Sequence, residues 1–189
     1  KAGHTYLLKV KSKEKVYSAT TIIPASPPIL DTIHFNIKEP SDTSATIRIL
    51  INDNSNEFNC YRFFTQIKDL DPTFSQTSIG VFDDLTFNGL TLNFELVRMP
   101  TSNILTANMT QEEYDNYYRM TFFQGDIVYI KSTTTDVWTK SYWSSLQSEI
   151  SAGQNPFVTP GTHPSNIEGE NVTGIWSGYH ARYDTLEFK

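Results

Sequence analysis

Hydrophobic and polar residues alternate along most of this chain, which is the pattern of strands that bury one face. The clearest example runs from Ala45 to Ile51, where an apolar residue stands at every second position. Similar alternation occupies 33–37, 61–67 and 90–97, and we expect further strands within 127–132 and 175–188. Asx, Pro and Gly turns separate these segments. We therefore predict an all-β fold, mainly an antiparallel sandwich or barrel, with one or two short helices.

The first 23 residues alternate in the same way and predict a hairpin from Thr5 to Val10 and from Val16 to Ile23. Pro24, Pro27 and Pro28 then mark a stiff linker. We place a boundary there, with the hairpin and linker in 1–26 and a main antiparallel domain in 27–189. Because an isolated hairpin is marginally stable in water, we expect it to dock on the main domain, on another chain or on a cleaved upstream fragment.

Two segments lack the strand alternation of apolar and polar residues, and their patterns predict helices. Asp136 can cap a helix over about 136–152, with a core stripe at every fourth residue formed by Trp138, Tyr142, Leu146 and Ile150. Thr110-Gln111-Glu112-Glu113 has the spacing of a capping box. That segment is either a short helix or a mobile polar excursion.

Composition supports the β prediction and excludes some partners. Ten Tyr and twelve Phe favour pleated, half-buried surfaces. The net charge of −6 argues against nucleic-acid binding, which needs clustered cations. No run approaches the roughly 20 apolar residues of a membrane helix. The lone Cys60 lies in a strand pattern, so we expect a buried, inert thiol.

Signatures of catalysis and of metal binding are missing. Ser177 lies one position away from the nucleophile of a Gly-x-Ser-x-Gly elbow, and the segment reads as the start of a strand. The four histidines are scattered, without zinc spacing. We favour turns over calcium for the oxygen-rich loop 52–56. We therefore expect no enzymatic activity, no catalytic residue, no metal and no cofactor.

Aromatic side chains offer the best route to a binding role. They can stack on a sugar or anchor a protein partner. The candidates for ligand or partner binding are Trp143, Trp176, Tyr114, Tyr117 and Tyr118. Two other functions stay open. One is a glycan-active hydrolase with a paired-carboxylate site, drawn from Asp69, Asp71, Asp83, Asp84 or Glu95. The other is a structural assembly subunit that pairs through an edge strand.

Three groups of short motifs point to a known family. They are Tyr6-Leu7-Leu8-Lys9-Val10 with 16–20, Gly80-Val81-Phe82-Asp83-Asp84 with 87–89, and a C-terminal group comprising Asn155-Pro156-Phe157, Ser165-Asn166-Ile167-Glu168-Gly169 and 174–179. In this order they resemble a Bacteroidetes outer-membrane lipoprotein family known as domain of unknown function 4249. The resemblance spans nearly the whole chain.

The resemblance carries several expectations. It implies a lipid-anchored, cell-surface protein of the outer membrane, with the anchor and the rest of an N-terminal sandwich domain upstream of this sequence. It also implies a TonB-dependent transporter or another surface protein as a partner, because members are often encoded beside such a transporter. Asp31-Thr32-Ile33 and Asp184-Thr185-Leu186 look like the O-glycosylation triplet of that lineage, which makes Thr32 and Thr185 candidate glycan sites.

Overall fold

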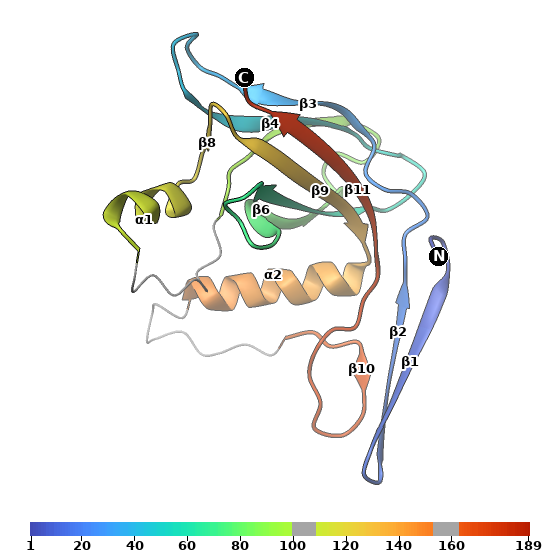
Figure 1. Cartoon of the computed structure of the whole chain (residues 1–189). Helices are drawn as coiled ribbons and strands as arrows, with labels where there is room; N and C mark the ends of the chain where they lie inside the picture. The colour runs from blue at the N-terminus through green and yellow to red at the C-terminus, as the bar shows by residue number, and fades with distance from the viewer. Residues whose placement is uncertain (100–108, 153–162) are drawn as a thin grey trace.

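The computed structural model describes residues 1–99, 109–152 and 163–189. Within these ranges the chain forms three antiparallel sheets and two helices (Figure 1). The prediction of an all-β antiparallel fold with short helices is confirmed. The described strands form open sheets packed face to face, so the sandwich alternative holds and the barrel does not.

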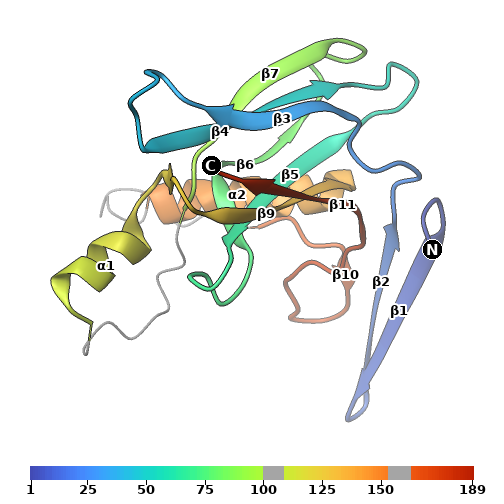
Figure 2. The same ribbon diagram turned by 45° about the horizontal axis from the view of Figure 1, so that its top comes forward.

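The first sheet has the order β3-β4-β7, formed by Leu30–Asn36, Ser44–Asn52 and Thr91–Leu96, and β8 (Phe122–Phe123) pairs with β4. The second sheet has the order β11-β9-β5-β6, formed by Tyr179–Glu187, Ile127–Thr135, Cys60–Ile67 and Ser75–Asp83. Figure 2 shows the two sheets as layers, with the first above the second.

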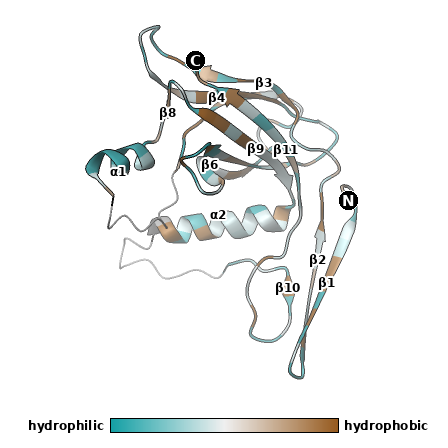
Figure 3. Ribbon diagram, viewed as in Figure 1, coloured by the Kyte–Doolittle hydropathy of each residue, from teal (hydrophilic) through white to brown (hydrophobic). Residues whose placement is uncertain are grey.

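The core lies between these two sheets. Alternate residues of β4, β5 and β9 point into it, as the sequence pattern predicts. Ile47, Ile49 and Phe63 are 0 % exposed. In Figure 3 the first half of β9 is drawn mainly in the hydrophobic colour, whereas α1 is mainly hydrophilic.

Two details of the strands differ from the sequence prediction. The strand β6 was not predicted, because its buried positions include Ser75 and Thr77 rather than large apolar residues. The closing strand begins at Tyr179, not near Ile175, because the side chain of Asn166 bonds both backbone groups of Trp176 in place of a neighbouring strand.

Helix α2 (Val137–Ala152) packs against β5 and β6, on the face of the second sheet that points away from the core. Asp136 caps it, since its Oδ1 accepts hydrogen bonds from the backbone and hydroxyl of Thr139 at 2.8 and 2.7 Å. The helix is therefore confirmed, but its predicted core stripe is wrong. Trp138 is 48 % and Ile150 is 63 % exposed.

The reason is that the sheet surface under α2 is polar. Lys140 forms a salt bridge of 2.7 Å with Asp83 of β6, and Gln147 accepts a hydrogen bond from Gln76 at 3.4 Å. The helix therefore turns Thr139, Trp143 and polar residues toward the sheet, and it turns Trp138 and Ile150 toward solvent. A core stripe inferred from spacing alone assumes an apolar partner surface.

Helix α1 (Gln111–Tyr118) confirms the helical alternative for the second segment. Thr110 and Glu113 form the predicted capping box, in which each side chain bonds the backbone nitrogen of the other. Neither α1 nor α2, the helices of the described ranges, is long and apolar enough to span a membrane.

The N-terminal hairpin of β1 (Thr5–Ser12) and β2 (Lys15–Ile22) is confirmed and extends away from the sandwich (Figure 1). The short strand β10 (Ile167–Glu168) adds to β2 as a third strand, with Ile167 opposite Ala19. The hairpin is thus docked on the C-terminal part of the same chain. The division of the chain into 1–26 and 27–189 stays a prediction.

Candidate functional site

The face of the second sheet that points away from the core carries two cations in neighbouring rows. In the strand register Arg62 lies opposite Thr133, and Phe64 lies opposite Lys131. Tyr183 of β11 flanks Lys131 on the other side. On this face of β5, β9 and β11, the only acidic residue of these described strands is Glu187, at the far end of β11. The face is therefore locally basic in a chain of net charge −6.

A hollow of about 320 Å³ opens on this face. The sheet forms its floor, α2 forms one wall with Trp143, and the segment before β11 forms another with Trp176. The lining residues are Arg62, Phe64, Thr133, Thr135, Thr139, Trp143, Ile175, Trp176, Ser177 and Tyr179. Charged, hydroxyl and aromatic groups thus meet at one place.

Arg62 is the charged group of this hollow. Its guanidinium carbon lies 4.3 Å from the centre of the Trp143 ring and 4.9 Å from that of Phe64. Nη2 donates a hydrogen bond of 2.8 Å to Gln76 Oε1. The buried Nε has no partner among the described residues, and no carboxylate of those residues forms a salt bridge with Arg62. Burial lowers the pKa of Arg62 to about 10, so the side chain stays charged at neutral pH.

Lys131 lies just outside the hollow. Its Nζ is 4.6 Å from the ring centres of both Phe64 and Tyr179, and it donates a hydrogen bond of 3.2 Å to the Tyr179 hydroxyl. The Phe74 ring is 5.8 Å away. Within the described ranges this ammonium group, like Arg62, has aromatic neighbours and no salt bridge.

Hydrogen bonds hold the walls of the hollow in place. Thr133 and Thr135 donate their hydroxyls to the backbone oxygens of Arg62 and Gly178. Asp136 caps α2 and also accepts a hydrogen bond of 2.7 Å from Thr21 of the N-terminal hairpin. The arrangement therefore depends on the sheet, on α2 and on the hairpin together.

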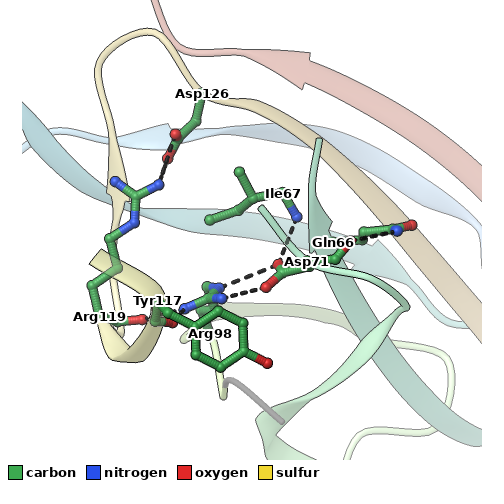
Figure 4. Close-up of polar contacts among 7 residues, drawn as sticks. All are labelled: Gln66, Ile67, Asp71, Arg98, Tyr117, Arg119 and Asp126. Carbon is green, nitrogen blue, oxygen red and sulfur yellow. Dashed lines mark hydrogen bonds and ion pairs between the residues drawn. The ribbon is translucent and has the colours of Figure 1, made fainter. Parts of the chain in front are cut away.

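A second, buried polar cluster lies at the other end of the sandwich and has a different character. Arg98 is 0 % exposed and pairs with Asp71, whose Oδ2 also accepts the Ile67 amide at 2.7 Å. Arg98 Nη1 donates to the backbone oxygens of Tyr117 and Arg119. Figure 4 shows the Arg98 guanidinium facing the Asp71 carboxylate. This cluster ties α1 to the loop after β5, so its role is structural.

The comparisons with known proteins give one result. The family model described as domain of unknown function (DUF4249) matches residues 1–184. The chain belongs to the DUF4249 family. Neither the search of curated proteins nor that of solved structures gives a match. The resemblance inferred from the motifs is thereby confirmed at the level of the family.

The motifs of this DUF4249 chain perform structural tasks around the hollow. Asn166 donates to the backbone oxygens of Trp176 and Thr20, at 2.7 and 3.2 Å, so it joins the wall of the hollow to the hairpin. A side chain at Gly178 would collide with Ile23. Gly169 has a φ of 148°, and its Cβ would meet Tyr17. Residues 155–157 lie outside the described residues.

The five aromatic candidates of the DUF4249 chain fall into two groups. Trp143 and Trp176 meet at the hollow. Tyr114, Tyr117 and Tyr118 lie on α1, where the Tyr117 side chain is buried and Tyr114 is 42 % exposed. The α1 group stacks mainly on itself, with ring centres 4.5 Å apart for Tyr114 and Tyr118. The structure therefore brings two of the five predicted residues into one site.

Sequence reasoning missed Arg62 and Lys131, which give the hollow its charge. Each stands at a polar position of an alternating strand, and such a position ordinarily points to solvent. The register places Lys131 between Phe64 and Tyr183, and the packing of α2 places Trp143 against Arg62. That register depends on long-range pairing and is not visible in either segment alone.

Four of the five acids considered for a hydrolase are engaged in structural contacts. Asp71 pairs with Arg98, Asp83 with Lys140 and Glu95 with Arg48. Asp84 is buried and accepts a hydrogen bond of 2.7 Å from the Asn59 amide. Asp69 occupies a left-handed turn with a φ of 62°. None of the five lines the hollow.

Asp84 has a further property. Burial raises its pKa above the ordinary value of 3.8, an effect that its hydrogen bonds to backbone amides partly oppose. Its Oδ1 has no hydrogen-bond partner among the described residues. The carboxyl therefore resists ionisation for a structural reason.

The loop that offered oxygen ligands uses them for turns, as predicted. Asn54 Oδ1 accepts the Asn56 amide at 3.1 Å, and Asp53 accepts hydrogen bonds from Gly89 and Tyr61. No group of three or more His, Cys, Asp or Glu in the described ranges is arranged to hold a metal. Cys60 is buried as predicted, and burial raises its pKa to about 12.

One arrangement looks like a catalytic triad. His163 contacts Ser145 Oγ through Nδ1 at 2.8 Å and Glu149 through Nε2. However, the Ser145 hydroxyl donates to the Tyr142 backbone oxygen at 3.0 Å, one turn earlier in α2. The hydroxyl therefore has a backbone acceptor in the helix besides the imidazole, an arrangement common for serine inside helices.

Thr32 and Thr185, the candidate glycan sites, both lie in strands and are exposed. Ser177 lines the hollow in a segment that precedes β11 and is not followed by a helix. The strand-to-helix turn of a nucleophile elbow is therefore missing there.

Proposed function

We propose that this chain is a non-catalytic binding protein, and that its ligand presents an anionic group to Arg62 in the hollow. The observation that carries the proposal is a half-buried guanidinium, held between aromatic rings, without a carboxylate partner among the described residues. Burying a charge without a counter-ion is costly. An anionic ligand would supply the missing charge.

The chemistry of the hollow favours a carboxylate attached to a ring. A guanidinium offers a planar fork of donors that matches a carboxylate. Trp143 and Trp176 supply flat faces for the rest of the ligand. A volume of about 320 Å³ is at the small end of ligand sites, which suits a single ring.

The non-catalytic part of the proposal is supported by the acids, which serve salt bridges and turns. None of these acids lines the hollow, so none is in place there to act as a general acid or base. We extend the proposal to the location: a lipid-anchored outer-membrane protein of Bacteroidetes, exposed at the cell surface and accessory to a TonB-dependent transporter. That part is supported by the family resemblance.

Calorimetric titration tests the binding site. The probes are benzoate and D-galacturonate, each compared with its uncharged counterpart, benzyl alcohol and D-galactose. We expect the acid of at least one pair to bind at least tenfold more tightly than its counterpart, because a charge-assisted bond to a guanidinium contributes about 1.5–3 kcal/mol. The Arg62→Met variant should bind that acid at least tenfold more weakly than the unmodified protein does.

Arg48→Met is the matched control, because Arg48 lies on the first sheet and pairs with Glu95. It should bind as the unmodified protein does. Equal binding of acids and neutral counterparts, or full binding by Arg62→Met, would overturn the proposal. The location is tested separately, by isolating the full-length protein from native outer membranes in mild detergent. Mass spectrometry should then identify a stoichiometric transporter, and its absence would remove that partner.

A further inference from the structure

The basic face continues beyond the hollow, and its extension has its own cation and its own rings. Phe64 and Tyr179 form the boundary, since both line the hollow and both contact Lys131. Beyond them lie Phe74 and Tyr183, with ring centres 6.0 Å apart. Tyr183 is 62 % and Tyr179 is 49 % exposed. Exposed rings on a sheet face form a platform rather than a core.

The two cations are spaced for two separate anionic groups. Arg62 and Lys131 belong to neighbouring rows of the register, which are two residues apart along a strand. Such rows are separated by about 7 Å. One small anion in the hollow meets Arg62, whereas Lys131 stands on the far side of Phe64 and Tyr179. The arrangement thus repeats a cation and flanking rings along one direction.

The same surface is poorly suited to an extended peptide. Peptides that add to a sheet bind the backbone groups of an edge strand. On the opposite face of β11, Arg182 donates to the Leu30 backbone oxygen at 3.2 Å and His180 contacts that of Ala25 at 3.0 Å, so that face is occupied by the segment 25–30. The free surface is the face of the sheet, which presents side chains and no row of backbone donors.

We infer that the ligand is an acidic oligosaccharide, with one sugar carboxylate on Arg62 in the hollow and the next sugar on the Tyr179 and Tyr183 platform beside Lys131. This inference rests on the proposed function. Pyranose rings present apolar C–H faces that pack on aromatic rings, and uronic acids carry one carboxylate on each ring. A chain of such sugars repeats a carboxylate and a ring, as the protein surface repeats a cation and rings.

The test compares monomers and trimers by calorimetric titration. The probes are galacturonate, glucuronate and mannuronate, each as the monosaccharide and as a trisaccharide, with triglutamate as an acidic peptide of equal charge. We expect at least one trisaccharide to bind at least tenfold more tightly than its monomer and more tightly than triglutamate. Arg62→Met should weaken both forms.

Two variants isolate the platform. Lys131→Met and Tyr183→Ala should reduce the trisaccharide affinity to that of the monomer and leave the monomer affinity unchanged. Lys9→Met, at an exposed lysine of the N-terminal hairpin, is the control and should change neither. Thermal unfolding of each variant shows that the fold is retained. A second platform variant, Lys131→Gln, replaces Lys131→Met if the latter unfolds.

The outcomes separate the two proposals. Arg62-dependent binding of monomers without any gain for the trisaccharides, or with an equal gain for triglutamate, would overturn the oligosaccharide inference and keep the anion site. A trisaccharide gain that Lys131→Met and Tyr183→Ala do not reduce would also overturn it. Equal binding by Arg62→Met and the unmodified protein would overturn the proposed function itself.

Discussion

Arg98 and Arg62 are both removed from solvent, but the protein treats them in opposite ways. Arg98 is 0 % exposed and faces the Asp71 carboxylate and two backbone oxygens. Arg62 is half-buried, donates to one amide oxygen and otherwise faces rings. The first guanidinium is satisfied by the protein. The second forms no salt bridge with the described residues, which is why we propose it as the anion site.

The difference suggests how a structural cation can be separated from one proposed to bind a ligand. Burial alone does not decide, since Arg98 is fully and Arg62 partly shielded from water. The decisive property is the balance of partners: a carboxylate and carbonyls for Arg98, and rings with one neutral amide for Arg62. A structural ion pair loses stability when one partner is removed, whereas a binding cation loses a ligand.

The largest expected effect is on Arg98. Arg98→Met leaves the Asp71 carboxylate buried without its cation, so we expect the free energy of unfolding in urea to fall by about 3–5 kcal/mol. Replacing both residues, as Arg98→Met with Asp71→Leu, should recover part of that loss. A fall of less than about 1 kcal/mol for the single variant would contradict the structural role of the pair.

A buried carboxyl without a cation extends the comparison. Because burial raises the pKa of Asp84, the folded protein still holds a proton that the unfolded chain has released, between pH 3.8 and the raised pKa. The free energy of unfolding therefore falls as pH rises through this range. Asp84→Asn removes that proton. Urea unfolding from pH 4 upward should show the unmodified protein losing stability relative to Asp84→Asn, and parallel pH profiles would contradict it.

Arg62 should behave unlike Arg98. Arg62→Met removes a charge that lacks a counter-ion and also loses the contact with Trp143, and these effects oppose each other. We expect the free energy of unfolding to change by less than about 1 kcal/mol. The same urea measurement checks it. A loss as large as that of Arg98→Met would mean that Arg62 holds the fold together.

The smallest effect is expected at the surface. Lys15 and Glu170 form a salt bridge of 3.0 Å between side chains that are 49 % and 73 % exposed. Lys15→Ala should change the free energy of unfolding by less than about 0.5 kcal/mol, because water screens such pairs. A thermal melt at low and high salt checks this, and a salt-dependent loss above that value would reveal a hairpin held by charge.

The sequence predicted the elements whose burial follows a simple period. The isoleucines of β4 alternate strictly, and Asp136 and Thr110 are strong caps. The strand β6 could not be predicted from the sequence, because Ser75 and Thr77 occupy buried positions where large apolar residues would be expected. Gly80, with a φ of 72°, also interrupts the pattern. The apolar residues at every fourth position predicted helix α2 correctly but not which of its faces is buried. The buried face depends on the polar residues of β5 and β6 that α2 packs against.

The candidate site was half predictable. Trp143 and Trp176 stand out because tryptophans are few and large. Arg62 and Lys131 do not, since only the pairing of the strands and the packing of α2 bring aromatic rings beside them. Side chains at polar strand positions need the neighbouring strands before their role can be inferred.

The pairing of the first and last parts of the chain has a consequence for how the protein acquires its shape. Thr20 and Asn166 are joined across 146 positions, and Ser18 and Glu168 across 150. Closing such a long loop is slow compared with forming a local hairpin. As the polypeptide emerges from the ribosome, the hairpin can gain its third strand only after residues 167 and 168 have been made. The contact of Asn166 that joins the wall beside Arg62 to the hairpin has to wait for the same stage.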